Sequence, residues 1–420
     1  MRFLPLTTAV AFLFLLNSCV KDQCSKVMTY IKYEPVYISQ EAIRAEPVMQ
    51  IAQTLKQPGK MYLYGTTLLI NEINEGIHFY DNTDPSNPLP LGFLSIPGNK
   101  EMAVVANILY ADNYTDLIAI DISDVQNIRF RKRIENVYSY FDTDPDKGIV
   151  VRYEEKEVTE EVDCNFFPDQ QNFIAANNSM NFNSTSSTAS SGGGSRELVG
   201  VGGSMARFAI NGANLYVVDH SNLQVFDLST PDNPVSVYQT MIGVNIETIF
   251  PYSNQLFIGS AVGMYIYDVS DPHLPVFRSV FEHAEVCDPV FVDGQYAYVT
   301  LRSGTECNGF VNQLDILDIS NLSQPVLLSS TTMQNPHGLT VYDNTLFLCE
   351  GALGFKVFDV NNKITGPQQS LFNDPSFFAF DALRIPGKDV VIVVGEDGFY
   401  QYDTQTPNAL SLLSRIEIEP

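Results

Sequence analysis

The 420-residue chain contains no tryptophan, and only 17% of its residues are charged. Basic residues are scarce: 24 Lys and Arg stand against 49 Asp and Glu, which gives a formal net charge of −25. This balance argues against nucleic acid and against charge-driven binding to an anionic membrane, because both surfaces are rich in phosphates. It suits a soluble body and leaves a cationic partner or a divalent metal open.

Long hydrophobic runs are absent except at the N-terminus, where Met1 and Arg2 precede FLPLTTAVAFLFLL and the sequence LNSC. The run is shorter than a bilayer-spanning helix requires. The segment resembles a bacterial lipoprotein signal. That resemblance implies cleavage before Cys19, a diacylglycerol on its sulfur, and anchoring of the protein to the outer membrane or cell surface by lipid. The periplasm-facing side stays open, as does an ordinary secretory signal with a chance Cys.

Cysteine is rare as well, and the six residues form neither a CxxC motif nor a Cys/His cluster at zinc spacing. We therefore predict no metal site and no cofactor. Export to an oxidising compartment would allow disulfides, and the five cysteines after Cys19 leave at least one free. We favour a Cys287–Cys307 disulfide, since these two lie 20 residues apart in one repeat unit. Cys349 is predicted to be a small buried hydrophobe.

What the chain does have is a repeated unit. A short apolar run ends in Asp and a polar turn follows, as in LQVFDLSTPDNP at residues 223–234. The seven aspartates are Asp81, Asp121, Asp227, Asp268, Asp318, Asp359 and Asp403. Their spacing is 40 to 50 residues, with one gap of 106 between the second and the third.

A period near forty with four short β-runs per unit predicts an all-β fold, a β-propeller of four-stranded antiparallel blades. The repeated Asp has a structural explanation: its carboxylate can accept the N–H groups of the turn that follows. Because this turn chemistry explains every copy, we prefer it to a ring of metal ligands.

The 106-residue gap predicts one degenerate unit at Asn136 to Val158, followed by a polar, disordered insertion at about 164–203. This gives eight blades, one of them degenerate, with seven as the alternative if that unit does not complete a blade. The predicted organisation is a signal at 1–18, a tether at 19–46 and a single propeller domain at 47–420. Either Pro47 to Leu55 or the C-terminal ALSLLSRIEI could supply the strand that closes the ring.

The units GIHFYD, LIAIDISD, LQVFDLSTPDNP, MYIYDVSDPHLP and LDILDISNLSQP resemble the LVIVD repeat of bacterial and archaeal cell-surface proteins. The resemblance extends from about residue 58 to the end of the chain. It implies a β-propeller at the cell surface, and it carries over no catalytic residue.

Aligning the first strands of the blades puts five polar residues near the face that carries the second-to-third-strand loops and the connections between blades, here called the mouth face. They are Glu101, Arg207, Glu247, Asp288 and His337. Such a set could form a polar ligand site, although propellers line their centre with polar residues in any case. Two long loops are predicted on the same face, which is typical of a binding face.

Three functions fit these patterns. The first is a lipid-anchored, non-catalytic binding or scaffold module for a protein or a glycan, expected to be monomeric. The alternative is a propeller-type hydrolase or lactonase that uses Glu247, Asp288 and His337 as a metal or acid/base site. The third is a glycan-binding accessory protein. No nucleophile elbow, P-loop or dinucleotide fingerprint is found in a suitable context, so we assign no catalytic residue.

Overall fold

The computed structural model describes residues 24–138, 141–165, 201–282, 289–302 and 311–419. These residues fall into two compact units. The first combines the chain up to Tyr37 with residues 150–182, and the second contains residues 38–149 and 183–420. Cys19, Asp288, the predicted Cys287–Cys307 disulfide and most of the insertion at 164–203 lie outside the described residues.

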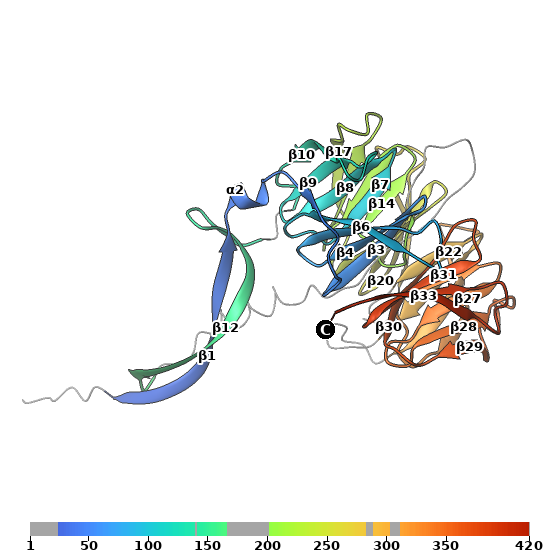
Figure 1. The fold of residues 1–420 in the computed structure, drawn as a ribbon. Helices are drawn as coiled ribbons and strands as arrows, with labels where there is room; N and C mark the ends of the chain where they lie inside the picture. Colours follow the sequence, from blue (N-terminus) through green and yellow to red (C-terminus); the bar gives the residue numbers. More distant parts are fainter. Residues whose placement is uncertain (1–23, 139–140, 166–200, 283–288, 303–310, 420) are drawn as a thin grey trace, which may run out of the picture. The chain divides into compact units, whose positions relative to one another are not determined.

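The second unit is a ring of seven blades (Figure 1). Each blade contains four consecutive antiparallel strands, numbered outward from the centre of the ring. The strands of the first four blades are β3 Pro58–Tyr64, β4 Thr67–Glu72, β5 Gly76–Asp81 and β6 Leu89–Ser95; β7 Met102–Val105, β8 Ile108–Asn113, β9 Asp116–Asp121 and β10 Arg129–Ile134; β14 Phe208–Asn211, β15 Asn214–Val218, β16 Asn222–Asp227 and β17 Val235–Met241; β18 Ile246–Tyr252, β19 Gln255–Ser260, β20 Gly263–Asp268 and β21 Val276–Glu282.

The last three blades have the same plan. Their strands are β22 Val290–Asp293, β23 Tyr296–Leu301, β24 Gln313–Asp318 and β25 Val326–Thr332; β26 Leu339–Tyr342, β27 Thr345–Cys349, β28 Phe355–Asp359 and β29 Ser370–Asp374; β30 Ala379–Arg384, β31 Val390–Gly395, β32 Gly398–Asp403 and β33 Ser411–Glu417. The predicted all-β propeller is confirmed.

The degenerate unit forms an eighth sheet among the described residues, and this sheet has three strands in the order β1-β12-β11. Their bounds are β1 Ser25–Ile38, β11 Thr143–Asp144 and β12 Gly148–Asp163. The unit therefore pairs with the predicted tether and does not complete a blade, so the described ring has the seven blades of our alternative. A short helix, α2 Gln40–Ile43, follows β1.

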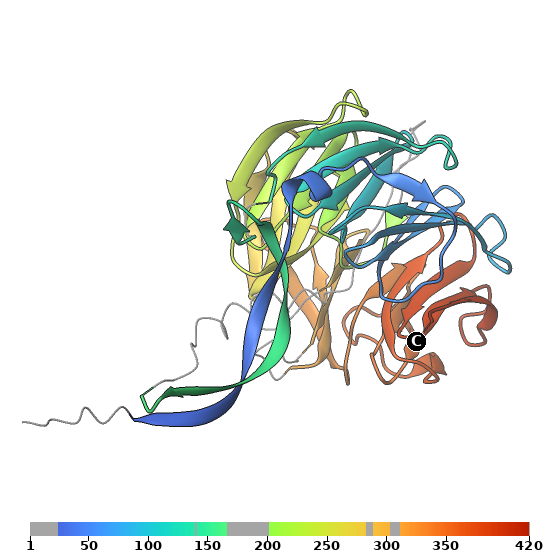
Figure 2. The ribbon, with the colours of Figure 1, turned by 60° about the vertical axis from the view of Figure 1, so that its left-hand side comes forward.

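The ring core runs between blades, because a four-stranded sheet buries its two faces only against neighbouring sheets. Successive hydrophobic clusters join blades 1 to 3, then 3 to 4, 4 to 5, 5 to 6, 6 to 7, and finally 7 to 1. Figure 2 shows the first and last blades, in blue and red, beside one another. At that joint Asn82 and Gln401 exchange two amide hydrogen bonds of 2.9 and 2.7 Å.

The ring is not closed by residues 47–55, which was one of the two expected ways. Residues 47–55 do not supply the outer strand of the last blade: β2 Val48–Gln50 pairs instead with β6, on the outer edge of blade 1. The C-terminal segment forms β33, so the last blade is built from its own strands. Leu55 adds a single parallel bridge to Ile418. Side-chain packing, rather than a shared strand, closes the ring.

The seven aspartates confirm the predicted turn. In every copy Oδ1 accepts the backbone N–H two residues later, at 2.7–2.9 Å. The donors are Thr83, Ser123, Ser229, Ser270, Ser320, Asn361 and Gln405. Hydrogen bonds from the Ser270 side chain, from Arg278 and from the Ser270 N–H lower the pKa of Asp268 to about 2. The repeated Asp is thus part of the fold.

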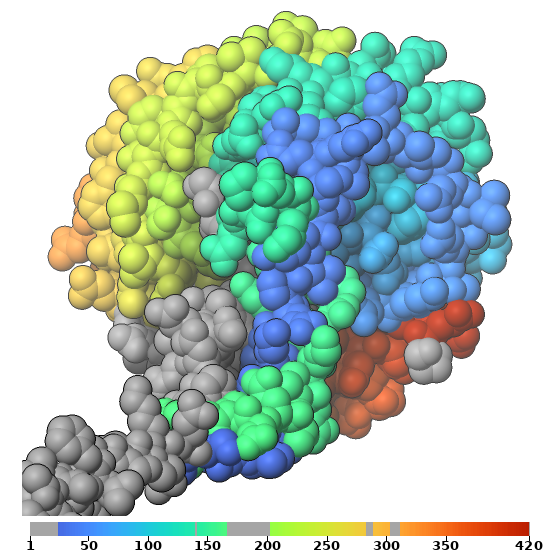
Figure 3. Space-filling view, turned by 90° about the vertical axis from the view of Figure 1, so that its left-hand side faces the viewer, coloured from blue at the N-terminus to red at the C-terminus, as the bar shows by residue number. Residues whose placement is uncertain are grey.

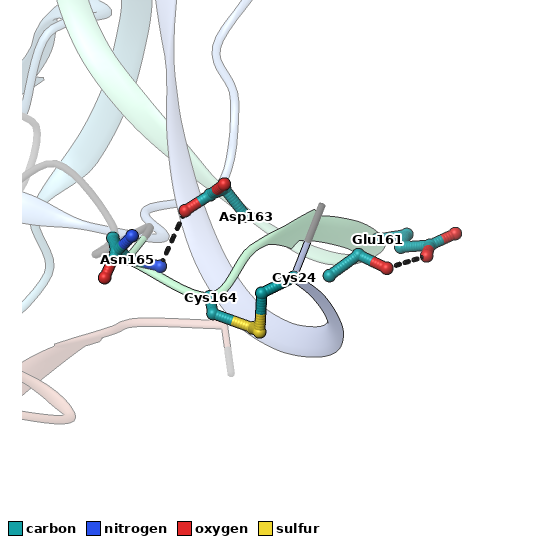
Figure 4. Close-up of a disulfide and its surroundings, with 6 residues drawn as sticks. Cys24, Glu161, Asp163, Cys164 and Asn165 are labelled. Carbon is teal, nitrogen blue, oxygen red and sulfur yellow. Dashed lines mark hydrogen bonds between the residues drawn. A yellow bond between two sulfur atoms is a disulfide. The ribbon is translucent and has the colours of Figure 1, made fainter. Parts of the chain in front are cut away.

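In the first unit, β1 and β12 run beside each other (Figure 3). We call this unit the ribbon, meaning residues 25–37 of β1 and 150–163 of β12. A disulfide joins Cys24 to Cys164 at its end (Figure 4), a pair that we did not predict. Cys349 is free and fully buried in blade 6, as predicted. Among the described residues, no helix is both long and apolar enough to cross a membrane.

Candidate functional site

Three of the five predicted mouth residues lie together. Glu101 and Arg207 immediately precede the first strands of blades 2 and 3, and Glu247 is the second residue of the first strand of blade 4. The Glu101 carboxylate accepts the Arg207 N–H at 3.2 Å, and Arg207 Nε donates to the Glu247 carbonyl at 3.3 Å. The alignment of first strands therefore predicted this contact, although two of its four hydrogen-bonding groups, the Arg207 N–H and the Glu247 carbonyl, belong to the backbone.

Lys60 completes the cluster and was missed. It occupies in blade 1 the position that Glu101 and Arg207 occupy in blades 2 and 3, so extending our alignment by one blade would have found it. The Lys60 ammonium is buried and pairs with the Glu101 carboxylate, and it donates to the Met205 carbonyl at 3.2 Å. Burial lowers the pKa of Lys60, while the charge of Glu101 opposes that change.

Two further ionisable groups surround this ion pair. Asp112, at the end of the second strand of blade 2, is buried, and burial raises its pKa to about 7. Its Oδ1 accepts the N–H groups of Lys100 and Glu101, at 2.7 and 2.8 Å, and the Asn99 side-chain amide at 2.8 Å. Burial also lowers the pKa of Lys100 to about 8. These contacts fix the loop before β7 in place.

A segment of the chain connects the inner strands of the ring. We call residues 201–207 the central segment; it includes the short strand β13 Val201–Gly202, which pairs with β3 of blade 1. Ser204 Oγ donates to Asp381 of blade 7 at 2.9 Å and accepts the Leu339 N–H of blade 6 at 2.9 Å. The Ala206 carbonyl accepts an N–H from blade 4 at 2.7 Å.

With the Arg207–Glu101 hydrogen bond to blade 2, the central segment contacts blades 1, 2, 4, 6 and 7. It then continues into blade 3. The close fit extends to the neighbouring backbone: a Cβ on Gly338 would collide with the Asp381 carboxylate. Residues up to about 203 were predicted to belong to a disordered insertion. The described residues 201–203 are instead ordered by contacts with blades remote in sequence.

His337 does not join the cluster. It packs edge-on between Phe378 and Phe380, with ring centroids 5.4 and 6.0 Å away. Burial lowers its pKa to about 3, so the ring is neutral at physiological pH. His220 lies nearer, in the turn after β15, and burial together with the charge of Arg207 lowers its pKa to about 4. Within the described parts of the chain, no three His, Cys, Asp or Glu residues are grouped as metal ligands.

Comparisons with known proteins address the fold. Residues 286–332, which contain the strands of blade 5, match the family model of the LVIVD repeat. No curated protein matches the chain in sequence. Similar solved structures include Sqt1 from Saccharomyces cerevisiae, with TM-score 0.51, 5% identity, and coverage of 92% of this chain and 89% of that one.

Two bacterial structures are similar to the same degree. One is the periplasmic gluconolactonase PpgL from Pseudomonas aeruginosa, with TM-score 0.52, 11% identity, and coverage of 86% of this chain and 96% of that one. The other is a candidate 6-phosphogluconolactonase from Bacteroides uniformis, with TM-score 0.53, 12% identity, and coverage of 87% and 98%. At such low identity the likeness concerns the fold alone. The protein is thus a β-propeller that contains the LVIVD repeat.

Proposed function

We propose that this protein is a non-catalytic binding module, tethered by lipid on Cys19 at the outer membrane or cell surface. The observation that carries this proposal is the state of the mouth-face cluster. Lys60 and Glu101 neutralise one another, and Arg207 bonds to the backbone of Glu247. Side chains that are held by such contacts are suited to a rigid binding surface. They are poorly suited to proton transfer, because a general acid or base must be able to reach a proton of the substrate.

The alternative is a hydrolase that acts on a lactone, the substrate class named for two of the similar structures. One observation favours it: Asp112 has a pKa of about 7, a value suited to a general base. However, Oδ1 of this carboxylate already accepts three hydrogen bonds from its own loop. We therefore assign Asp112 to positioning of the loop and keep the hydrolase as the second candidate.

One set of assays separates the two functions. The purified full chain is incubated with 6-phosphogluconolactone and with gluconolactone, and its bound Ca and Zn are measured by elemental analysis. We expect no turnover above the spontaneous rate and no stoichiometric metal. Turnover that Asp112→Asn abolishes, while the melting temperature is retained, would establish the hydrolase.

The anchoring is tested separately. We expect the wild-type chain to fractionate with membranes and Cys19→Ala to be released, because a cysteine-linked lipid supplies the attachment. Metabolic labelling with a palmitate analogue provides the direct readout. A labelled Cys19→Ala variant would contradict the lipid assignment and would leave the binding proposal standing.

A further inference from the structure

The joint between blades 5 and 6 departs from the joints that follow blades 2 and 3. In blades 2 and 3 the third residue of the second strand is a tyrosine whose hydroxyl donates to the next blade's Asp turn. Tyr110 donates to the Pro231 carbonyl at 2.6 Å, and Tyr216 to the Pro272 carbonyl at 2.9 Å. Tyr298 is the equivalent residue of blade 5, but its buried hydroxyl has no hydrogen-bond partner among the described residues.

The turn that follows in blade 6 also differs in sequence. After Asp359 the chain reads VNNKITGP, so proline comes at Pro367 and not within the turn. The carbonyl equivalent to those that Tyr110 and Tyr216 use belongs to Lys363, and it accepts the Ser329 hydroxyl at 2.8 Å. The Lys363 ammonium lies 5.7 Å from the centre of the Tyr298 ring.

A second departure, in this case from blades 2 and 4, concerns the outer strand of blade 5; blades 1, 3, 6 and 7 share it, with Leu91, Val237, Leu371 and Leu413 at the bulge. In blades 2 and 4 the residue at the β-bulge of the outer strand is an arginine that pairs with the repeated Asp. Arg131 bonds Asp121 and Arg278 bonds Asp268, each at 2.5 Å. The bulge residue of blade 5 is Leu328, between the paired positions 327 and 329.

Asp318 consequently lacks the arginine that its counterparts in blades 2 and 4 have. Its Oδ1 accepts the Ser320 N–H at 2.8 Å, and bonds to Ser320 hold the pKa of Asp318 below its usual value. The carboxylate is therefore ionised at neutral pH, and its two oxygens can accept further hydrogen bonds besides those from Ser320.

Both departures border one cavity of about 560 Å³, within the range of ~300–1,000 Å³ of small-molecule sites. It is an open groove at the end of the blades that carries the Asp turns, opposite to the mouth face. Its lining consists of Tyr296, Asp318, Leu328, Asn361, Asn362, Lys363 and Ile364.

The only cation of this lining is already engaged. Lys363 Nζ donates to Asn344 Oδ1 at 2.8 Å and to the Val360 carbonyl at 2.5 Å, and it lies 5.2 Å from the centre of the Tyr296 ring. The charges of Asp293 and Asp359 also act on it. Since acidic groups outnumber this lysine, the groove does not favour an anionic ligand.

The remaining groups are one carboxylate, two amides, a tyrosine and two aliphatic side chains. Asn362 Oδ1 caps its own turn by accepting the Ile364 N–H at 3.1 Å, which leaves its NH₂ to donate outward. Carboxylate and amide groups accept from and donate to hydroxyls, and Leu328 and Ile364 offer apolar contact. A neutral polyhydroxylated ligand can bond to both the carboxylate and the amides, because each of its hydroxyls both donates and accepts hydrogen bonds.

We propose that this groove binds a neutral saccharide, with Asp318, Asn361 and Asn362 contacting its hydroxyls. The site goes beyond the function proposed above, because it lies on the opposite face and would exist even if the mouth face bound nothing. Leu328→Arg is the decisive variant. It restores the arginine that blades 2 and 4 carry at this position, so it pairs with Asp318 and fills the groove without opposing the fold.

The test probes the full chain on an array of neutral, sialylated and uronate-containing oligosaccharides. We expect binding to neutral glycans and a loss of affinity of at least about tenfold in Leu328→Arg, since a hydrogen-bonded carboxylate is withdrawn from the ligand. Leu327→Arg is the matched control, because it adds the same charge one residue away, on an exposed side chain outside the groove. It should bind like the wild type.

Asn361→Ala provides a second variant, because the bond that joins Asn361 to Asp359 comes from the Asn361 backbone N–H, which alanine retains. It should weaken binding while the melting temperature is unchanged. The proposal is overturned if no neutral glycan binds, if only acidic glycans bind, or if Leu328→Arg and Leu327→Arg lose affinity equally. Capture of peptides on a peptide array that Leu328→Arg abolishes would also overturn it, in favour of a peptide groove.

Discussion

The ring and the ribbon are both made of antiparallel strands, but they are stabilised differently. Every blade of the ring shares a buried cluster with its neighbours, and most side chains of the inner three strands are buried. The ribbon has largely exposed faces: Val27 is 74% and Ile31 51% exposed. It is held by strand pairing, by polar pairs such as Thr29–Thr159 at 2.8 Å, and by the Cys24–Cys164 disulfide.

This difference shows what a repeat needs in order to become a blade. A blade-like pair of strands without an apolar face gains nothing by stacking in a ring, since hydrophobic burial is what joins neighbouring sheets. Residues 148–163 have only Ile149 and Val162 buried. Two-stranded sheets are marginal on their own, which gives the disulfide its importance.

The largest difference in stability between ring and ribbon is expected when a buried side chain of the ring is truncated. Phe399 is fully buried in the cluster that joins blade 7 to blade 1. We expect Phe399→Ala to lower the free energy of unfolding by about 3–5 kcal/mol, through lost burial and the cavity left behind. Ile31→Ala in the ribbon should change it by no more than about 0.5 kcal/mol. If urea denaturation showed equal losses of unfolding free energy in the two variants, the proposed difference between ring and ribbon would be wrong.

A buried carboxyl in blade 2 should make the stability of the ring depend on pH. The pKa of Asp112 rises from 3.8 to about 7 on folding. The folded state therefore binds the extra proton between these values, and stability falls as the pH rises from about 4 to 7, by roughly 4 kcal/mol at most. Lys100, whose pKa is about 8, stays protonated through this range.

Urea midpoints measured across this range check the prediction. Asp112→Asn keeps an oxygen that can accept the loop N–H groups and removes the titration, so its profile should be flatter. If the urea midpoint of Asp112→Asn fell with pH as steeply as that of the wild type, another group would be responsible for the pH dependence.

The disulfide should matter for the ribbon. It closes a loop with a sequence separation of 140 residues and should contribute about 2–4 kcal/mol. In the double variant Cys24→Ser, Cys164→Ser we expect faster amide exchange at residues 25–37 and 150–163, with little change in the inner strands of blades 3 to 6. Reduced wild-type protein serves as the control, and unaltered exchange in the ribbon would refute the prediction.

The amide pair at the ring joint should have the smallest effect. Asn82 and Gln401 are 1% and 0% exposed, and their side-chain amides bond to one another. Asn82→Ala should lower the free energy of unfolding by about 1–3 kcal/mol, because it leaves a buried amide unsatisfied. The double variant with Gln401→Ala should lose less than the sum of the two single losses in a double-mutant cycle; additive losses would exclude coupling.

Much of this architecture could be predicted because it depends on local chemistry. The Asp turn is satisfied two residues after each aspartate, and turns such as Asp343–Asn344, both at positive φ, are typical of tight hairpins. Alignment of the first strands brought Glu101, Arg207 and Glu247 to one place. It failed for His337, since its ring turns into an aromatic cluster from blade 7 that no local pattern announces.

The sequence by itself determined the repeat, the four-stranded blade and the turn that ends each third strand, because these need only neighbouring residues and the alternation of apolar side chains. Only the tertiary structure decided that the seventh blade closes on the first by side-chain packing, that residues 25–37 pair with residues 150–163, and that residues 201–207 cross the centre of the ring. Most of these contacts join segments more than 100 residues apart. Their partners are selected by burial and hydrogen bonding in the assembled ring, and no local sequence pattern encodes such a choice.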